Sequence, residues 1–251
     1  IAKNDSTSIF GAAISVSESP VQQGLIYVGT DDGVISVTED NGATWRRLES
    51  VSGVPDMTLV EDIIASQHSA DVAYAVFDNH KRGDDKPYIY RTTNRGRSWT
   101  PIASDLPEIG AAHTIAEDHG DPNLLFVGTE LGLYYTQNGG GSWHQLKGNF
   151  PTIAVRDIEI QRRENDLVIG TFGRSIYVLD DYTPLRTNAA RIQSASLFGK
   201  TGTSLIDACW AWPGTGSLKN SMSRCTIVRP RAFRTARATT FLSSRTLPGQ
   251  W

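Results

Sequence analysis

Cysteine is almost absent from this chain, and acidic residues are absent from one part of it. The 251 residues include only two cysteines, Cys209 and Cys225, both near the C-terminus. A framework of several disulfides is therefore excluded; whether these two pair stays open, and their spacing matches no zinc motif. A repeat region without cysteine is compatible with an oxidising compartment. No apolar run is long enough for a membrane-spanning helix, and we expect no metal and no cofactor.

The C-terminal part of the chain has a composition of its own. Residues 208–251 carry seven basic side chains and no acidic one, whereas the remaining 17 basic and all 27 acidic residues lie in the first 207. The segment is rich in Ser, Thr, Arg and Gly without a lasting period, which is typical of disorder. We expect 187–251 to be an irregular or disordered basic tail, or the product of a shifted reading frame. It contains no aromatic-basic platform of a nucleic-acid-binding module, so we expect no nucleic-acid partner.

One eight-residue signature occurs three times in the rest of the chain. In each copy a Thr is followed by Asp or Asn two positions later, Gly four later and Trp seven later. Asp and Asn side chains hydrogen-bond to nearby backbone and Gly accepts a positive φ, so each copy predicts a compact hairpin loop. We expect a structural role for these twelve residues: Thr38, Asp40, Gly42, Trp45, Thr92, Asn94, Gly96, Trp99, Thr136, Asn138, Gly140 and Trp143.

Each signature belongs to a longer repeat. Apolar residues alternate with polar ones before and after Gly-containing turns, as in 25–48 and 124–146, and this alternation predicts strands. A further apolar run precedes each copy, and a last copy at 166–181 keeps two strands but lacks the signature. Units of four strands that recur every 42 to 51 residues indicate a β-propeller.

We therefore predict an all-β fold, a partial β-propeller of about four four-stranded blades over residues 1–186, followed by the irregular tail. The repeat units lie at about 8–50, 57–105, 109–150 and 151–186. Propellers usually have about four to eight blades. Three full units and most of a fourth are few for closure, so we expect the remainder of a longer parent chain; a closed four-bladed ring is the alternative.

The signature resembles the Asp-box, or BNR repeat, of sialidases, sortilin-type receptor domains and secreted bacterial propeller proteins. The phrase GTFGRSIYVLDDYTPLR (170–186) is similar to the closing blade of exported bacterial proteins described as BNR-repeat glycosyl hydrolases or sortilin/VPS10-like propellers, and the resemblance covers about 8–186. It implies a secreted or periplasmic location and carbohydrate hydrolysis. The chain departs from true sialidases, because it has no Arg-Ile-Pro stretch, and from xyloglucan-cleaving enzymes, which use two Asp on two propellers.

Ligands of propellers usually bind at the channel mouth, on loops away from the signature hairpins. Phe172 belongs to these loops, and Glu61 lies near the innermost strands. The catalytic candidates are carboxylates, which at a suitable separation can act as the acid and base of glycoside hydrolysis: Asp32, Asp62, Glu130 and Asp157. The ligand-binding candidates are Arg174, His113 and Arg156. Plainer roles are available for most of them, including a hairpin turn at Asp32 and ion pairs between blades.

We expect an Asp-box propeller module of an exported protein that binds glycan or protein through its blade loops. Two alternatives stay open, a glycosidase of the sialidase or xyloglucanase type and a structural scaffold within a larger protein. Whether the chain is an enzyme depends on geometry. Two carboxylates about 5–10 Å apart in one pocket favour hydrolysis, whereas carboxylates paired with Arg or Lys oppose it.

Overall fold

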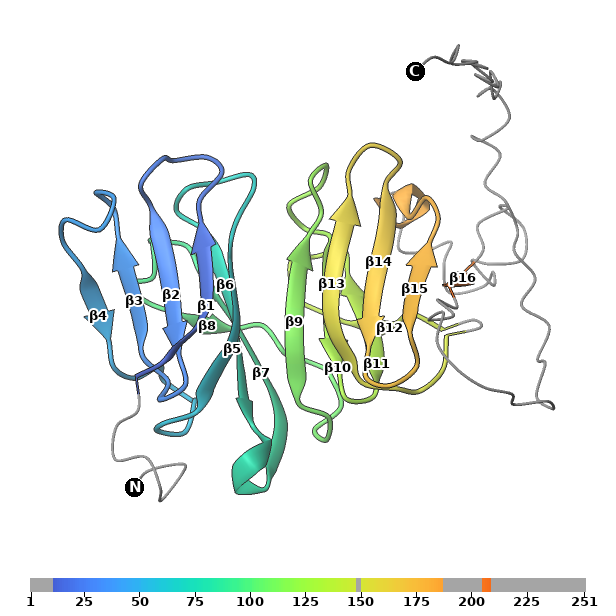
Figure 1. The fold of residues 1–251 in the computed structure, drawn as a ribbon, viewed down its shortest axis with the longest axis horizontal. Coiled ribbons are helices and arrows are strands. Elements are labelled where there is room, and N and C mark those ends of the chain that lie inside the picture. The colour runs from blue at the N-terminus through green and yellow to red at the C-terminus, as the bar shows by residue number, and fades with distance from the viewer. Residues whose placement is uncertain (1–10, 148–149, 187–204, 209–251) are drawn as a thin grey trace, which may run out of the picture. The chain divides into compact units, whose positions relative to one another are not determined.

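The computed structural model describes residues 11–147, 150–186 and 205–208. Within these ranges the strands form four antiparallel sheets, and each sheet is made of four strands in chain order (Figure 1). We number the sheets as blades 1 to 4. Neither of the two short 3-10 turns in this part of the chain, η1 (His80–Arg82) and η2 (Thr183–Arg186), can span a membrane. The all-β propeller architecture predicted from the repeats is confirmed.

The four strands of each blade follow one another along the chain. Blade 1 contains β1 (Ala13–Glu18), β2 (Ile26–Thr30), β3 (Ile35–Thr38) and β4 (Arg46–Leu48). Blade 2 contains β5 (Leu59–Ala65), β6 (Ala73–Asn79), β7 (Asp84–Thr92) and β8 (Thr100–Pro101). Blade 3 contains β9 (Ala112–Glu117), β10 (Leu125–Thr129), β11 (Gly132–Thr136) and β12 (His144–Gln145). Blade 4 contains β13 (Val155–Gln161), β14 (Asp166–Thr171), β15 (Ile176–Leu179) and β16 (Leu205–Ala208).

The last strand, β16, lies inside the segment that the composition predicts to be irregular. It pairs antiparallel with β15 and completes blade 4. The other residues of 187–251, with Cys209 and Cys225, lie outside the described residues, so the predictions of disorder, of a shifted frame and of a disulfide stay predictions.

The hydrophobic core lies between successive blades. The first strands contact one another in the order β1, β5, β9 and β13, and three apolar clusters fill the spaces between blades 1 and 2, 2 and 3, and 3 and 4. Strands β6 and β10, in the middle blades, are buried along their whole length, whereas β2 and β14 alternate between buried and half-buried residues. A middle strand packs on both faces and therefore reads as a continuous apolar run.

The three signature hairpins, which we call boxes, connect the third and fourth strands of blades 1 to 3. In box 1 the Thr38 hydroxyl donates to Asp40 at 2.8 Å and accepts from the Gly42 N–H at 2.8 Å. Asp40 also accepts from the Thr44 N–H at 2.8 Å and hydroxyl at 2.6 Å. Asn41 and Gly42 have φ of 59° and 88°, so the loop needs left-handed backbone at two successive positions.

Boxes 2 and 3 repeat this network with Asn in place of Asp40, and the structure adds one member that the four-position signature omits. The Asx side chain binds the hydroxyl residue that precedes the Trp, which is Thr44, Ser98 or Ser142. A hydroxyl residue at the seventh position of every copy, directly before the Trp, is the signal that could have identified it.

The tryptophans of boxes 2 and 3 reach beyond their own hairpins. The Trp143 indole N–H donates to the carbonyl of Ile102 at 2.7 Å, and Trp99 belongs to the apolar cluster between blades 1 and 2. A Cβ built on Gly96 would lie 3.1 Å from Val37 of blade 1. Boxes 2 and 3 therefore pack onto the preceding blade as well as closing their own hairpins, whereas the Trp45 indole N–H of box 1 donates to the Gly42 carbonyl within its own hairpin.

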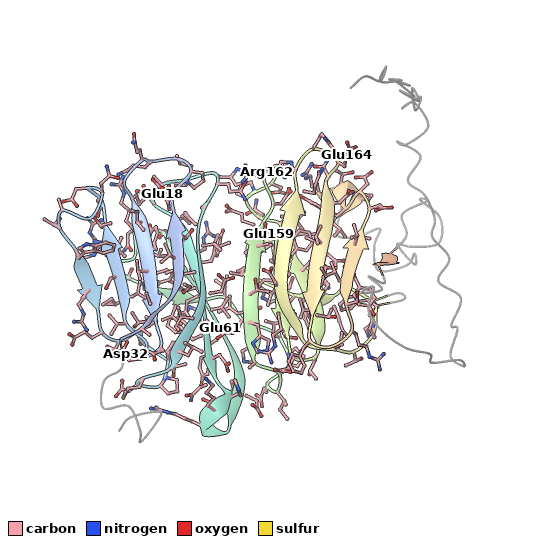
Figure 2. The ribbon with its side chains drawn as sticks, viewed as in Figure 1. Glu18, Asp32, Glu61, Glu159, Arg162 and Glu164 are labelled. Carbon is pink, nitrogen blue, oxygen red and sulfur yellow. The ribbon has the colours of Figure 1, made fainter. Side chains whose placement is uncertain are left out.

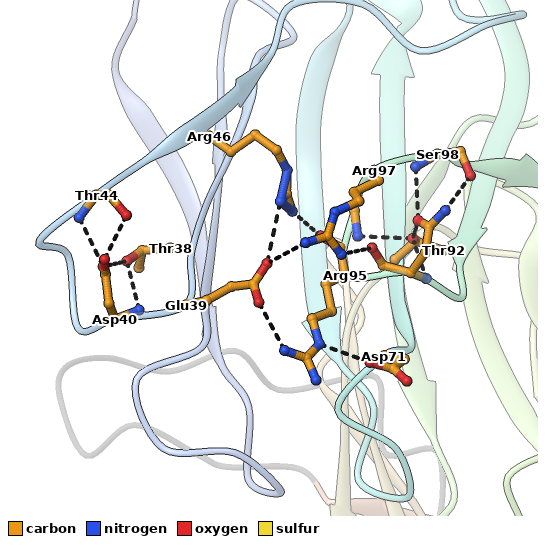
Figure 3. Close-up of polar contacts among 12 residues, drawn as sticks. Thr38, Glu39, Asp40, Thr44, Arg46, Asp71, Thr92, Arg95, Arg97 and Ser98 are labelled. Carbon is orange, nitrogen blue, oxygen red and sulfur yellow. Dashed lines mark hydrogen bonds and ion pairs between the residues drawn. The ribbon is translucent and has the colours of Figure 1, made fainter.

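Charged side chains reinforce the same contact between blades 1 and 2. Figure 3 shows Glu39 among three guanidinium groups, with Arg95 at 2.8 Å, Arg97 at 3.2 Å and Arg46 at 3.4 Å. Arg95 also pairs with Asp71 at 2.8 Å. These groups are partly exposed, so solvent screening limits their contribution to stability.

Candidate functional site

We define the mouth as the end of the blades at which each first strand begins and each second strand ends. The boxes lie at the opposite end. In Figure 2, Asp32 and Glu61 lie toward the mouth, whereas Glu18, Glu159 and Glu164 lie toward the other end. The candidate site is built from side chains of blades 2, 3 and 4 at the mouth.

A β-bulge at the start of each first strand positions these side chains. The pairing register skips one residue in β1, β5, β9 and β13, and the skipped residues are Ile14, Glu61, His113 and Arg156. A bulged residue is left out of the ladder and its side chain is re-aimed. Three of the four bulged residues can carry charge, so the bulges place ionisable groups of three successive blades at one end of the sheets.

His113 and Arg156 share Glu130, which follows β10. The buried His113 ring places Nε2 2.9 Å from the Glu130 carboxylate, and the Arg156 guanidinium lies 2.8 Å from the same oxygen. A second Arg156 nitrogen lies 3.0 Å from His113 Nδ1. Because guanidinium only donates, Nδ1 must accept and Nε2 must donate to Glu130, which requires a neutral imidazole. Burial, followed by the positive charge of Arg156, lowers the pKa of His113.

The β14–β15 loop adds an exposed aromatic ring beside this network. Phe172 is 70% exposed, and the Arg156 guanidinium carbon lies 5.5 Å from the centre of its ring. The Phe172 N–H donates to the Ala154 carbonyl at 2.9 Å, which fixes the loop to the start of β13. Arg174, two positions on, is exposed and makes no hydrogen bond or ion pair with any described residue.

Glu61 lies on the blade 2 side of the mouth. Burial, and then the negative charge of Asp78, raise the pKa of this half-buried carboxyl. Asp78 is itself buried, binds the His80 ring and accepts from the His80 N–H at 2.9 Å. Asp78 and His80 are not among the site residues predicted from the sequence; the signal for them is the longer polar loop after β6.

The remaining candidates are not brought into this network. Asp32 accepts from the hydroxyl of Thr30 within the β2–β3 turn of blade 1. Asp62 accepts from the Thr114 hydroxyl at 3.1 Å and from the Ile115 N–H at 3.0 Å, so it links blades 2 and 3; burial raises its pKa. Asp157 is exposed, and its side chain makes no hydrogen bond with the described residues.

The arrangement is suited to holding a ligand. Glu130 is held by Arg156 and His113, and Asp62 by its neighbouring blade, so neither is an unengaged carboxylate. Phe172 and Arg174 present an apolar ring and a cation to solvent. Across the described ranges, no three His, Cys, Asp or Glu side chains are arranged to hold a metal ion.

The four consecutive four-stranded sheets define the class of this protein as a β-propeller. No protein-family model and no curated protein sequence matches the chain. Several solved structures are similar to the chain. The GH74 xyloglucanase from Xanthomonas campestris is 19% identical with a TM-score of 0.56, and the match covers 70% of this chain and 30% of the enzyme.

Two further similar structures have other roles. YCF48 bound to a D1 peptide is 17% identical with a TM-score of 0.51, over 68% of this chain and 51% of YCF48. The extracellular domain of BT4673 from B. thetaiotaomicron is 15% identical with a TM-score of 0.52, over 72% of this chain and 22% of that domain. The chain thus spans about half of YCF48 and less of the other two. At these identities the likeness shows the fold alone.

Proposed function

We propose that this chain is a ligand-binding propeller module of an exported protein, and that the mouth is its binding surface for a glycan or a protein segment. The observation that carries the proposal is the set of bulged residues. Glu61, His113 and Arg156 occupy one structural position in three blades, where a β-bulge turns them to the mouth. Bulges are over-represented next to functional sites because they re-aim side chains.

Binding fits this site better than hydrolysis. A glycosidase needs one carboxyl that is free to give a proton and a second that is free to attack or to activate water. Glu130 is in contact with Arg156 at 2.8 Å, and Asp62 accepts two hydrogen bonds from blade 3. Asp32 accepts a hydrogen bond from Thr30, so of the four catalytic candidates only Asp157 has a side chain without a hydrogen bond in the described part of the chain. The Asp-box resemblance therefore supports the repeat and the export of the protein more than it supports catalysis.

The exposed ring of Phe172 suits either ligand class, because the face of a sugar and an apolar side chain can both stack on it. The similar structures include an enzyme named for xyloglucan, a propeller bound to a peptide and an extracellular domain. They support an extracellular location, and they are compatible with either a glycan or a peptide as the ligand. A scaffold role without a ligand is the remaining alternative.

The test is a thermal-shift screen of the chain against oligosaccharides and peptides, followed by calorimetry on each hit and an assay for released sugar. We expect binding without turnover. Phe172→Ala and Arg174→Ala should weaken it about tenfold, since each removes a contact of roughly 1 kcal/mol or more. Val21→Ala, on an exposed residue at the opposite end, is the matched control. A ligand insensitive to both mouth variants would contradict the site, and turnover would favour the glycosidase.

A further inference from the structure

The face of blade 1 that points away from blade 2 is apolar and unpartnered among the described residues. Two positions after each bulge, the first strand carries Val16, Ile63, Ile115 or Ile158. The three isoleucines pack on the preceding blade and are 5% exposed or less, whereas Val16 is 64% exposed. These four residues occupy the same position in their strands. Val16 alone is exposed, because no blade among the described residues precedes blade 1.

The box tryptophans show the same contrast. Trp99 and Trp143 are buried against the blade before them, whereas Trp45 is 47% exposed. We call Val16, Val28 and Trp45 the incoming face of blade 1. Its counterparts in blades 2 and 3 show what covers such a face, because each is covered by the second and third strands of the preceding blade.

Blade 4 presents the complementary surface. Its residues Val168, Gly170, Ile176 and Val178 occupy the ladder positions that in blade 1 belong to Tyr27, Gly29, Ile35 and Val37 and that cover blade 2. In blade 4 these positions are half-buried or exposed. We call them the outgoing face of blade 4.

The incoming face of blade 1 and the outgoing face of blade 4 also carry a complementary hydrogen-bond donor and acceptor. Asp62 and Asp157 occupy the same position, directly after the bulge, and Asp62 accepts from the N–H of Ile115 in the next blade. Asp157 has no such donor among the described residues. The residue of blade 1 that corresponds to Ile115 is Val16.

We propose that the outgoing face of blade 4 binds the incoming face of blade 1 of a second copy of this chain. Asp157 of one copy accepts a hydrogen bond from the Val16 N–H of the other, and Trp45 packs over Val168 and Val178. The contact continues a packing that the chain already makes three times. It is heterologous, so two copies close into a ring or further copies extend a series, depending on the rotation between them.

The proposed contact is less well filled than those within the chain. At two of the existing contacts a glycine faces a valine of the next blade: a Cβ on Gly29 would lie 2.4 Å from Val60 Cγ1, and one on Gly128 would lie 2.6 Å from Val155 Cγ1. In the proposed contact Gly170 faces Ala13, the residue that corresponds to Val60. Two missing methyl groups leave a gap there, so we expect a weak, concentration-dependent association.

The test is sedimentation velocity of the full chain over a range of concentrations. We expect a monomer of 27.4 kDa that associates as concentration rises. Val16→Glu should weaken association about tenfold or more, because it places a charge in the apolar contact. Ala13→Val should strengthen it by filling the gap beside Gly170. Ile109→Glu, at an exposed residue outside both faces, is the control and should change nothing.

Circular dichroism of each variant checks that it is folded, which Val16→Glu should be, since its side chain touches solvent in the single chain. A chain that stays monomeric at all concentrations would overturn the proposal; so would association that Val16→Glu leaves intact or that Ile109→Glu disrupts. A dimer and a longer series both support it, provided that both respond to Val16→Glu.

Discussion

Replacing the three box tryptophans one at a time with alanine should produce unequal losses of stability, although the three sequences around them are alike. Trp99 and Trp143 are almost fully buried between blades, and removing a buried Trp side chain costs about 3–5 kcal/mol. Trp45 is half exposed, so Trp45→Ala should cost roughly half as much, about 1.5–2.5 kcal/mol. The ranking follows from the presence or absence of a preceding blade.

Substituting phenylalanine for a box tryptophan separates the contribution of ring packing from that of the indole hydrogen bond. Trp143→Phe leaves the buried Ile102 carbonyl without its 2.7 Å donor, which adds about 1–3 kcal/mol to the packing loss. The buried indole N–H of Trp99 has no hydrogen-bond partner in the described part of the chain, so Trp99→Phe carries no such addition. We therefore expect Trp143→Phe to be the more costly of the two.

The assay is urea unfolding followed by far-ultraviolet circular dichroism, at a chain concentration below that of any association. Free energies are compared only among variants with equal m-values, because a changed slope signals a changed denatured or native state. If Trp45→Ala costs as much as Trp99→Ala, the boxes act only within their own hairpins. If Trp99→Phe costs as much as Trp143→Phe, the hydrogen bond to Ile102 contributes nothing measurable.

Three other predictions concern charge. Asp40→Asn should leave stability at neutral pH almost unchanged, because the other boxes use Asn, whereas Asp40→Ala should lower the melting temperature. Hydrogen bonds from Thr44 hold the pKa of Asp40 at about 2, so the wild type should lose this contribution as pH falls from about 4 toward 2, and Asp40→Asn should not; melting curves over this range decide it. Because burial and Arg156 lower the pKa of His113, the unfolded chain binds the proton more readily, and stability should fall as pH drops below about 6.5; if His113→Gln shows the same fall, another group causes it. Arg156→Ala breaks a pair with Glu130 that is about one-third exposed and should cost only about 0.5–1 kcal/mol in urea unfolding; a loss of several kcal/mol would show that the mouth network is a core element.

Much of the fold could be predicted from local pattern. The box positions, the alternating apolar residues and the repeat pitch are properties of residues close together in the sequence. They predicted the four-stranded blades, and the apolar run that precedes each copy forms its first strand. The boxes also predicted their own left-handed turns, because Asn and Gly at successive positions favour positive φ.

The arrangement of the site depends on information that a local pattern does not contain. Glu61, His113 and Arg156 all stand within predicted strands, and only the pairing register shows that each is a bulged residue. Asp62 and Asp157 have equivalent places in their blades, yet one is bound by the next blade and the other is exposed. The groups that bind Asp62 lie 52 and 53 positions away in the chain, so a local pattern does not identify them.

The close approach of glycine and valine between blades has a consequence for blade order. Gly29 faces Val60 and Gly128 faces Val155, but in the space between blades 2 and 3 the sizes are reversed: Val76, at the position of Gly29, shares a core cluster with Ala112, at the position of Val60. At each of the three contacts a larger residue faces a smaller one. The larger residue belongs to the following blade at the first and third contacts and to the preceding blade at the second. Stacking blade 2 directly onto blade 4 would set Val76 against Val155, while blade 1 against blade 3 would set Gly29 against Ala112. The alternation of larger and smaller residues thus disfavours packing between blades that are not neighbours in the chain, by steric overlap in the first case and by a gap in the second.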